Sequence, residues 1–178
     1  YVGWINYNKG IDVLLEAMRG LAARGLPGRL AVVGGSYYRN TRLQEERLRA
    51  LAASLDLGDR VEFLGRQPPE EVARLMARSA VVVLPSRAES FGAVLVEALA
   101  CGTPVVATRC GGPEDIVDDE VGRLVPVGDP AALADAITAV LASRAAYDPA
   151  ALRARAVERY SWETVVERVR ALYPRAAA

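Results

Sequence analysis

The sequence predicts an α/β fold with a doubly wound parallel sheet. Short runs rich in Val, Ile and Leu alternate with longer amphipathic segments along the whole chain. Strands that alternate with helices at this spacing are typical of a parallel sheet covered on both faces. The 178 residues, 52% of them hydrophobic, suffice for one domain with its own core. Right-handed crossovers would then place a ligand crevice beyond the carboxyl ends of the strands.

The expected elements follow from the apolar pattern. Buried strands are predicted at residues 1–5, 30–34, 60–65, 80–85, 104–108 and 122–127. Helices are predicted between them at residues 10–24, 41–55, 69–78, 92–100 and 130–142. Residues 148–178 predict two further C-terminal helices, and Ser161, followed by Glu163 and Thr164, is typical of a helix start. The architecture is therefore Rossmann-like, with extra C-terminal helices.

Composition excludes several functional classes. Lys plus Arg and Asp plus Glu balance at 22 each, so no net field favours nucleic acid or an anionic membrane. The chain has no histidine, which removes histidine-based catalysis, and Cys101 and Cys110 are too few for a disulfide framework. Without a transmembrane run or a signal-peptide pattern in residues 1–20, we expect a cytoplasmic protein. Surface association through a missing segment stays open.

The stretch "PSRAESFGAVLVEALACGTPVVAT" holds the first candidate site. A predicted strand ends in the loop "SRAES", and a helix is expected to begin near Phe91 or Gly92. The free N–H groups at a helix start attract anions, and Gly92 would let a phosphate approach the backbone closely. The simpler interpretation is that Ser90 caps a helix that packs on the sheet.

Glu97 stands in a helical segment that is otherwise almost wholly apolar. We expect its carboxylate to be buried, and a buried unpaired charge costs several kcal/mol, so it needs a partner or a polar cavity. The partner could be an arginine, which would be structural. It could instead be a ligand with paired hydroxyl groups, such as a ribose.

Five segments together resemble the donor-binding, carboxyl-terminal half of retaining glycosyltransferases of the GT-B fold, a family that includes glycogen and sucrose synthases. Glu89 and Glu97 have the E-x7-E spacing of that family's donor signature. The five matching segments, in the family's order, are "NKGIDVLLEAM", "RVEFLG", "VLPSRAESFG", "GTPVVATRCGGPEDIV" and "VGRLVPVGD".

The resemblance implies a role for each matching residue. Glu97 would accept the ribose hydroxyls of a nucleotide sugar, Lys9 would contact its diphosphate, and Glu89 would contact the transferred sugar. Lys9 and Glu89 are thus the catalytic candidates, with Glu89 a sugar contact and not an established nucleophile. Arg66 and Gln67 would lie beside the base. The backbone that holds the sugar and the diphosphate would be that of Ser90, Phe91, Gly92, Ala93 and Val94. No metal and no cofactor is expected.

Trp4 is a departure from the family pattern. The family commonly has G-R-x4-K-G in its first loop, whereas this chain reads "GWINYNKG". One diphosphate-binding cation is therefore missing; either Arg39 or Arg66 compensates for it, or phosphate binding is weaker. We expect Trp4 to be a buried aromatic at the end of a strand. Packing at a domain cleft or contact with an acceptor are the alternatives.

Residues 117–122, "VDDEVG", offer three consecutive acids, but Asp and Gly are ordinary turn formers, so a turn is the preferred interpretation over a metal site. Because the sequence starts inside an expected strand, we expect a preceding domain, and the resemblance implies that this domain binds the acceptor. Two other functions stay open: a stand-alone nucleotide-binding or regulatory module, and an enzyme of other chemistry on this architecture, such as an epimerase or a phosphorylase. The sugar, the base and the acceptor are not specified.

Overall fold

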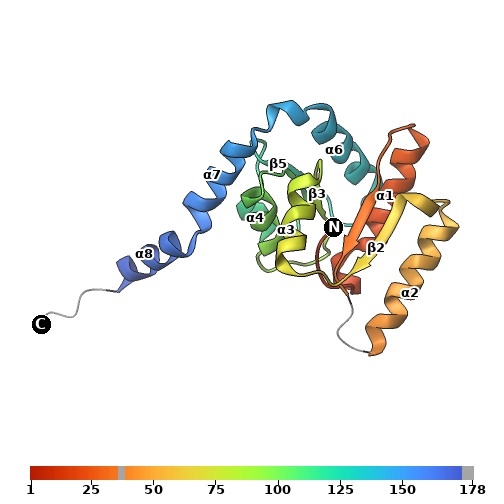
Figure 1. Cartoon of the computed structure of the whole chain (residues 1–178), viewed down its shortest axis with the longest axis horizontal. Coiled ribbons are helices and arrows are strands. Elements are labelled where there is room, and N and C mark those ends of the chain that lie inside the picture. Colours follow the sequence, from red (N-terminus) through yellow and green to blue (C-terminus); the bar gives the residue numbers. More distant parts are fainter. Residues whose placement is uncertain (36–38, 174–178) are drawn as a thin grey trace, which may run out of the picture.

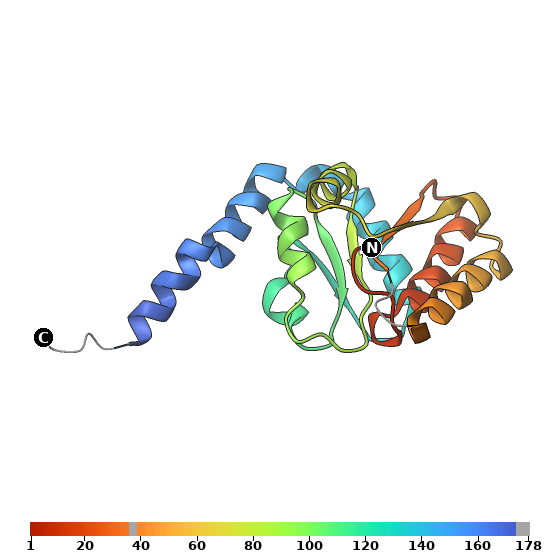
Figure 2. The ribbon, with the colours of Figure 1, turned by 60° about the horizontal axis from the view of Figure 1, so that its bottom comes forward.

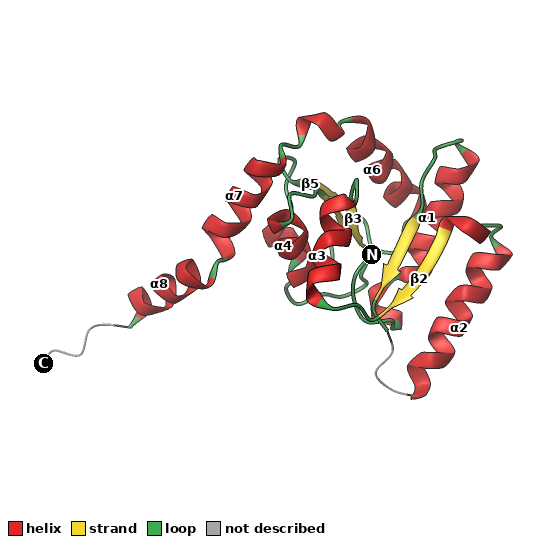
Figure 3. Cartoon of the chain, viewed as in Figure 1, coloured by secondary structure: helices red, strands yellow, loops and turns green. Residues whose placement is uncertain are grey.

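The computed structural model describes residues 1–35 and 39–173, without the side chains of residues 39–42. Its helices α1 to α8 are Ile11–Ala23, Arg39–Ser54, Pro69–Arg78, Ala93–Ala100, Pro113–Ile116, Pro130–Ala142, Pro149–Tyr160 and Trp162–Leu172. Its strands β1 to β5 are Leu30–Val33, Val61–Gly65, Val82–Leu84, Val105–Thr108 and Gly122–Val125. Three 3-10 turns, η1 to η3, are Tyr7–Lys9, Gly58–Arg60 and Arg144–Ala146. The predicted α/β class with parallel strands is confirmed (Figure 3).

The strands form two parallel groups. β1 pairs with β2, and β4 lies between β3 and β5. All residues of β3 and β4 are buried, as expected for strands covered on both faces. β2 differs from the expectation of a buried strand, since Glu62 is exposed and its other residues are half-buried. Its only partner among the described strands is β1, so it forms an edge.

The expected first strand, residues 1–5, is reduced to a single parallel bridge between Val2 and Val33. The Gly3 N–H donates to the Val33 carbonyl at 2.9 Å, and the Val33 N–H donates to the Tyr1 carbonyl at 2.9 Å. Gly3 then has φ +152°, a conformation that takes the chain away from a regular ladder. The segment still runs beside β1, which places residues 4–10 at the carboxyl end of the strands.

Helices cover both faces of the strands. α1 packs against α6, and α3 packs against α4. α4 and α6 lie on opposite sides of β3, β4 and β5 (Figure 2). Leu14, Leu95 and Leu133, from α1, α4 and α6, have no exposed surface and belong to one continuous core. This sandwich fixes the strand ends, so the loops beyond them have a rigid base.

The two predicted C-terminal helices are present as α7 and α8. α7 packs on α4, whereas α8 extends away from the body of the molecule (Figure 1). Ser161 begins α8 as predicted, because its hydroxyl accepts a hydrogen bond from the Thr164 N–H at 3.2 Å. Within residues 1–35 and 39–173, no helix combines the length and the apolar character needed to cross a membrane.

Candidate functional site

Two loops meet at the carboxyl ends of the strands. The first is η1 with Gly10, and the second, residues 86–92, follows β3. Gly10 has φ +62°, and any side chain there would collide with the carbonyl oxygen of Pro85. The Arg87 N–H donates to the Asn8 carbonyl at 2.7 Å. Glycine at position 10 thus permits the close contact that joins the two loops.

Lys9 and Glu89 form an ion pair across these loops. The Lys9 Nζ lies 2.5 Å from Glu89 Oε2, and the two side chains are only 21% and 15% exposed. They are 80 positions apart in the sequence, and the fold brings them together at the end of the strands. Both catalytic candidates therefore occupy one partly buried place, where their charges are less screened than on an open surface.

A third loop, after β4, supports Glu89 from the other side. The Glu89 N–H donates to the Cys110 carbonyl at 3.3 Å, and the Gly112 N–H donates to the Glu89 carbonyl at 2.9 Å. A Cβ at Gly112 would collide with the backbone of Phe91, and one at Gly111 would lie 2.9 Å from the Glu89 carbonyl oxygen. The two glycines thus allow this loop to fix the backbone around Glu89.

The start of α4 lies next to this ion pair. Its N-cap residue is Gly92, with φ +93°, and no side chain caps it. The interpretation of Ser90 as the N-cap is therefore wrong, because the helix begins two residues later through a left-handed glycine. Ser90, Phe91 and Ala93 are exposed, whereas Gly92 is buried and its carbonyl accepts a hydrogen bond from the Leu95 N–H at 2.8 Å. The first turn of this eight-residue helix therefore lies at the surface without a side-chain cap. Val94 is half-buried.

Glu97 is exposed. The expectation of a buried carboxylate was wrong, and the argument from desolvation does not apply. The reason is geometric: Leu95, Ala98 and Leu99 face the core, whereas Glu97 lies on the open side of α4. Glu89 and Glu97 nevertheless lie at either end of one short segment, one before α4 and one on it.

A pocket of about 200 Å³ lies at the ends of β1 and β2. Trp4, Arg66 and Gln67 line it, so the two residues predicted to lie beside a base share a cavity with Trp4. The Arg66 guanidinium lies 5.4 Å from the centre of the Trp4 ring, a cation–π distance. Trp4 is 44% exposed, which corrects the expectation of a buried aromatic. The side chain of Arg39 lies outside the described residues.

Arg87 and Asp12 form a contact that the sequence did not predict. Arg87 Nη1 and Nη2 donate to the two carboxylate oxygens of Asp12 at 2.9 and 2.7 Å. Burial would raise the pKa of Asp12, but the hydrogen bonds and the charge of Arg87 outweigh it and lower that pKa. Both residues stand in recognised motifs, K-G-x-D and P-S-x-x-E, but no signal in one sequence links them across 75 positions.

Tyr1 and Cys110 also belong to the surroundings of Glu89. Burial, and then the charge of Glu89, raise the pKa of the Tyr1 hydroxyl, which donates to the Trp4 carbonyl at 2.7 Å. Burial raises the pKa of the Cys110 thiol, with Glu89 and Glu114 adding to the shift. Cys101 and Cys110 are free thiols, as expected. Both Tyr1 and Cys110 are thus neutral at pH 7, and Lys9 is the cation that faces Glu89.

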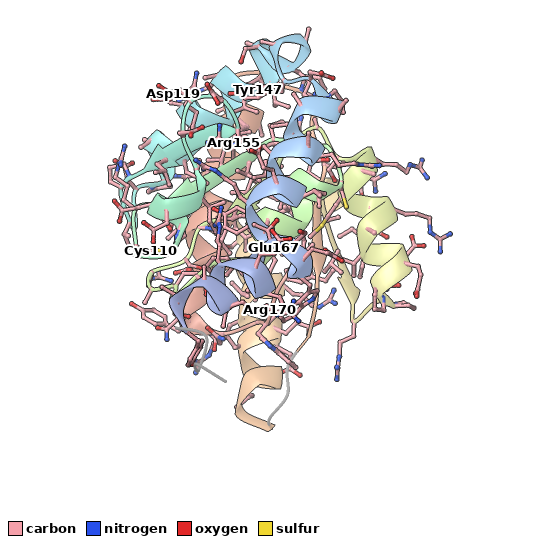
Figure 4. The ribbon with its side chains drawn as sticks, turned by 90° about the vertical axis from the view of Figure 1, so that its left-hand side faces the viewer. Cys110, Asp119, Tyr147, Arg155, Glu167 and Arg170 are labelled. Atoms are coloured by element: carbon pink, nitrogen blue, oxygen red, sulfur yellow. The ribbon has the colours of Figure 1, made fainter. Side chains whose placement is uncertain are left out.

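The acidic turn at residues 117–122 is held by Arg155 of α7. Arg155 forms ion pairs with Asp118 and Glu120. Figure 4 shows Arg155 on α7 facing the turn that carries Asp119. Among the residues that the structure describes, no group of three His, Cys, Asp or Glu residues could hold a metal ion. The carboxylates of Asp118 and Glu120 therefore tie this turn to α7 through Arg155.

Comparison with known proteins identifies the family. The family described as "Glycosyl transferases group 1" matches residues 1–160. A D-inositol 3-phosphate glycosyltransferase of Acidothermus cellulolyticus is 40% identical over 192 residues, covering 100% of this chain and 41% of the relative. The chain thus spans less than half the length of that relative.

Solved structures agree with this assignment. Sucrose-phosphate synthase of Thermosynechococcus elongatus has a TM-score of 0.87 and 36% identity over 97% of this chain and 43% of its own. Anabaena HepE, crystallised with UDP and glucose, has a TM-score of 0.84 and 26% identity over 96% of this chain and 46% of its own. On this evidence, the chain belongs to the group 1 glycosyltransferases, which have the GT-B fold.

Proposed function

We propose that this chain is the donor-binding half of a retaining glycosyltransferase that takes a sugar from a UDP- or GDP-linked donor. The observation that carries the proposal is the Lys9–Glu89 pair, 2.5 Å apart, beside the open N-terminus of α4. A donor of this class presents a diphosphate, which needs cations and N–H groups, and a sugar, which needs acceptors for its hydroxyls. These groups come together where the loops of Lys9 and Glu89 meet the start of α4, a place that we call the crevice.

Each charged side chain then has one part of the donor to bind. Lys9 and the first turn of α4 bind the diphosphate, where positive charge stabilises the leaving group as the glycosidic bond breaks. Glu89 accepts hydrogen bonds from the sugar, and Glu97 accepts them from the ribose. The exposure of Glu97 supports its role, because a carboxylate that must meet a ligand has to be reachable.

The pocket lined by Trp4, Arg66 and Gln67 is the proposed base site. Arg66 over the Trp4 ring also supplies a second cation near the place where the family commonly has an arginine. The UDP bound to HepE supports a uracil base, with guanine as the alternative. Retention of anomeric configuration, independence from metals and a cytoplasmic location rest on the sequence prediction.

The acceptor site is proposed to lie in a part of the enzyme outside this chain. The chain's 41% share of the relative's length supports this. α8 supports it as well, because it has no buried residue and carries a run of exposed apolar side chains. These side chains are Trp162, Val165, Val166, Val169 and Leu172, and the exposed Tyr173 follows directly after the helix. Peripheral contact with a membrane would also come through that other part.

A thermal-shift panel of UDP-, GDP- and ADP-sugars tests the proposal. We expect the UDP or GDP series to raise the melting temperature of wild-type protein, since a ligand that binds only the folded state stabilises it. Lys9→Ala should reduce that shift. Arg24→Ala should not, because Arg24 follows the far end of α1, where it forms an ion pair with Asp135 of α6. A folded wild-type sample that none of the three series stabilises would contradict donor binding. Donor binding without transfer by the full-length protein would favour the stand-alone module.

A further inference from the structure

Arg87 makes more cross-loop contacts than the ion pair with Asp12 alone. Its Nη1 also donates to the Tyr7 carbonyl at 2.7 Å, and its own N–H donates to the Asn8 carbonyl at 2.7 Å. The guanidinium carbon lies 4.1 Å from the centre of the Tyr7 ring. Arg87 is therefore bonded to the two residues of η1 that directly precede Lys9.

These contacts lie on both sides of Lys9. On one side, the Arg87 side chain donates to the Tyr7 carbonyl and the Arg87 backbone N–H donates to the Asn8 carbonyl. On the other side, the side chain binds Asp12, in the first turn of α1. Lys9 lies between these points, so its backbone is bracketed by one side chain that comes from the loop of Glu89. A bidentate arginine–carboxylate pair has a defined geometry, which a single contact lacks.

The Arg87 guanidinium is occupied by contacts within the protein. Both of its terminal nitrogens are engaged with Asp12, and its side chain is only 21% exposed. Lys9, by contrast, is paired with Glu89 in the crevice. The two cations of these loops thus have different tasks: one faces the crevice, and the other faces the backbone that carries the first.

We propose that Arg87 is a positioning residue for Lys9: together with Asp12 it sets where the Lys9 ammonium stands when a diphosphate enters the crevice. This inference rests on the proposed function, because it assumes that Lys9 binds the diphosphate. Arg87 does not itself touch the donor. Without the contacts of the Arg87 side chain, the Lys9 ammonium would sample many positions. Fixing it in one position on a diphosphate would then cost conformational entropy.

The test compares nucleoside diphosphates with nucleosides. UDP and GDP, and uridine and guanosine, are titrated into wild type, Arg87→Ala, Arg87→Lys and Asp12→Asn, with thermal melts as a check on folding. Arg24→Ala, which removes a remote ion pair, is the matched control. We expect Arg87→Ala to weaken the diphosphate about tenfold, equivalent to about 1.4 kcal/mol, and to leave the nucleoside unchanged. Arg87→Lys, which lacks the bidentate fork, should restore only part of the affinity.

A double-mutant cycle with Lys9→Ala makes the test specific. If Arg87 acts through Lys9, then Arg87→Ala should cost nothing further in the Lys9→Ala background. The positioning role would be overturned if Arg87→Ala lowered the affinities for diphosphate and nucleoside equally. It would also be overturned if Arg87→Ala lowered diphosphate affinity as much in the Lys9→Ala background as in wild type. Wild-type affinity of Arg87→Ala for the diphosphate would overturn it too. Failure of wild type to bind either diphosphate would instead contradict the proposed function, so the two failures are distinguishable.

Discussion

The Lys9 ammonium lies 2.5 Å from the Glu89 carboxylate, although the two residues are 80 positions apart. Lys9 lies on the loop after the Val2 bridge, and Glu89 lies on the loop after β3. The contacts of Arg87 with η1 join the two loops. In this structure, each charge compensates the other. Under the proposed function, a diphosphate would compete with Glu89 for Lys9 and the sugar hydroxyls would compensate Glu89, so donor binding would exchange one ion pair for two sets of ligand contacts.

Lys9→Ala should weaken diphosphate ligands and spare the nucleoside. A charge-assisted contact is worth about 1.5 to 3 kcal/mol, so UDP or GDP affinity should fall by at least tenfold. Isothermal titration with the diphosphate and the nucleoside measures both. Equal losses for the two ligands would mean that Lys9 supports the loop and does not touch the phosphates.

Glu97→Ala should weaken nucleotide binding more than it weakens the fold. Because Glu97 is exposed, its removal should change the free energy of unfolding by less than about 0.5 kcal/mol. Loss of two ribose contacts should reduce nucleotide affinity by about 1.5 to 3 kcal/mol. Titration and urea denaturation give the two values. A variant that melts much earlier yet binds like wild type would show a structural role instead.

The Asp12–Arg87 pair should make the free energy of unfolding decrease as pH falls in the acidic range. The folded-state pKa of Asp12 is lowered, so its ion pair stabilises the fold above the unfolded carboxyl pKa of about 3.9 and is lost as pH falls through the folded value. Asp12→Asn should therefore reduce the unfolding free energy at pH 7, and this deficit should shrink as pH falls below about 3.9. Urea denaturation at pH 7 and at a series of lower pH values measures this. A deficit of the same size throughout the series would refute the electrostatic account.

Removal of divalent metal should leave donor binding unchanged. The acids at Asp118 and Glu120 are paired with Arg155, which disfavours their use as metal ligands. The affinity for UDP- or GDP-sugar, measured by titration, should be the same in EDTA and in magnesium. A large loss in EDTA that magnesium restores would require a metal in the donor site.

Residues 1–178 alone should bind a donor without glycosylating an acceptor. Transfer requires an acceptor hydroxyl within about 3.5 Å of the anomeric carbon, and placing it needs a second surface. Closure of that surface over the crevice would also exclude water. Product analysis by mass spectrometry should show at most slow donor hydrolysis. Robust transfer by this chain would end the half-enzyme interpretation.

The alternation of strands and helices was predictable because buried parallel strands and amphipathic helices have distinct apolar periods. The bounds of α3 and α6 match the prediction, whereas the strand at residues 1–5 failed because Gly3 takes a backbone conformation that period alone does not specify. The E-x7-E spacing indicated the candidate site, which stays a prediction. Apolar neighbours suggested that Glu97 is buried, but they lie on other faces of α4.

Long-range pairing was the part that the sequence could not supply. Arg87 meets Asp12 across 75 positions, and Arg66 lies over Trp4, which comes from a different segment. Each pair depends on how loops converge at the strand ends, which no local pattern encodes. The same limit applied to Arg155, whose contact with the acidic turn is not indicated by any local pattern.

A crystal structure of this chain with a UDP- or GDP-sugar tests the central claim most directly. We expect the diphosphate against Lys9 and the first turn of α4, the ribose hydroxyls on the Glu97 carboxylate, the sugar beside Glu89, and the base in the pocket of Arg66 and Gln67. A nucleotide sugar bound elsewhere, such as in the cavity of about 640 Å³ lined by Arg155 and Arg168, with this crevice empty, would contradict the account.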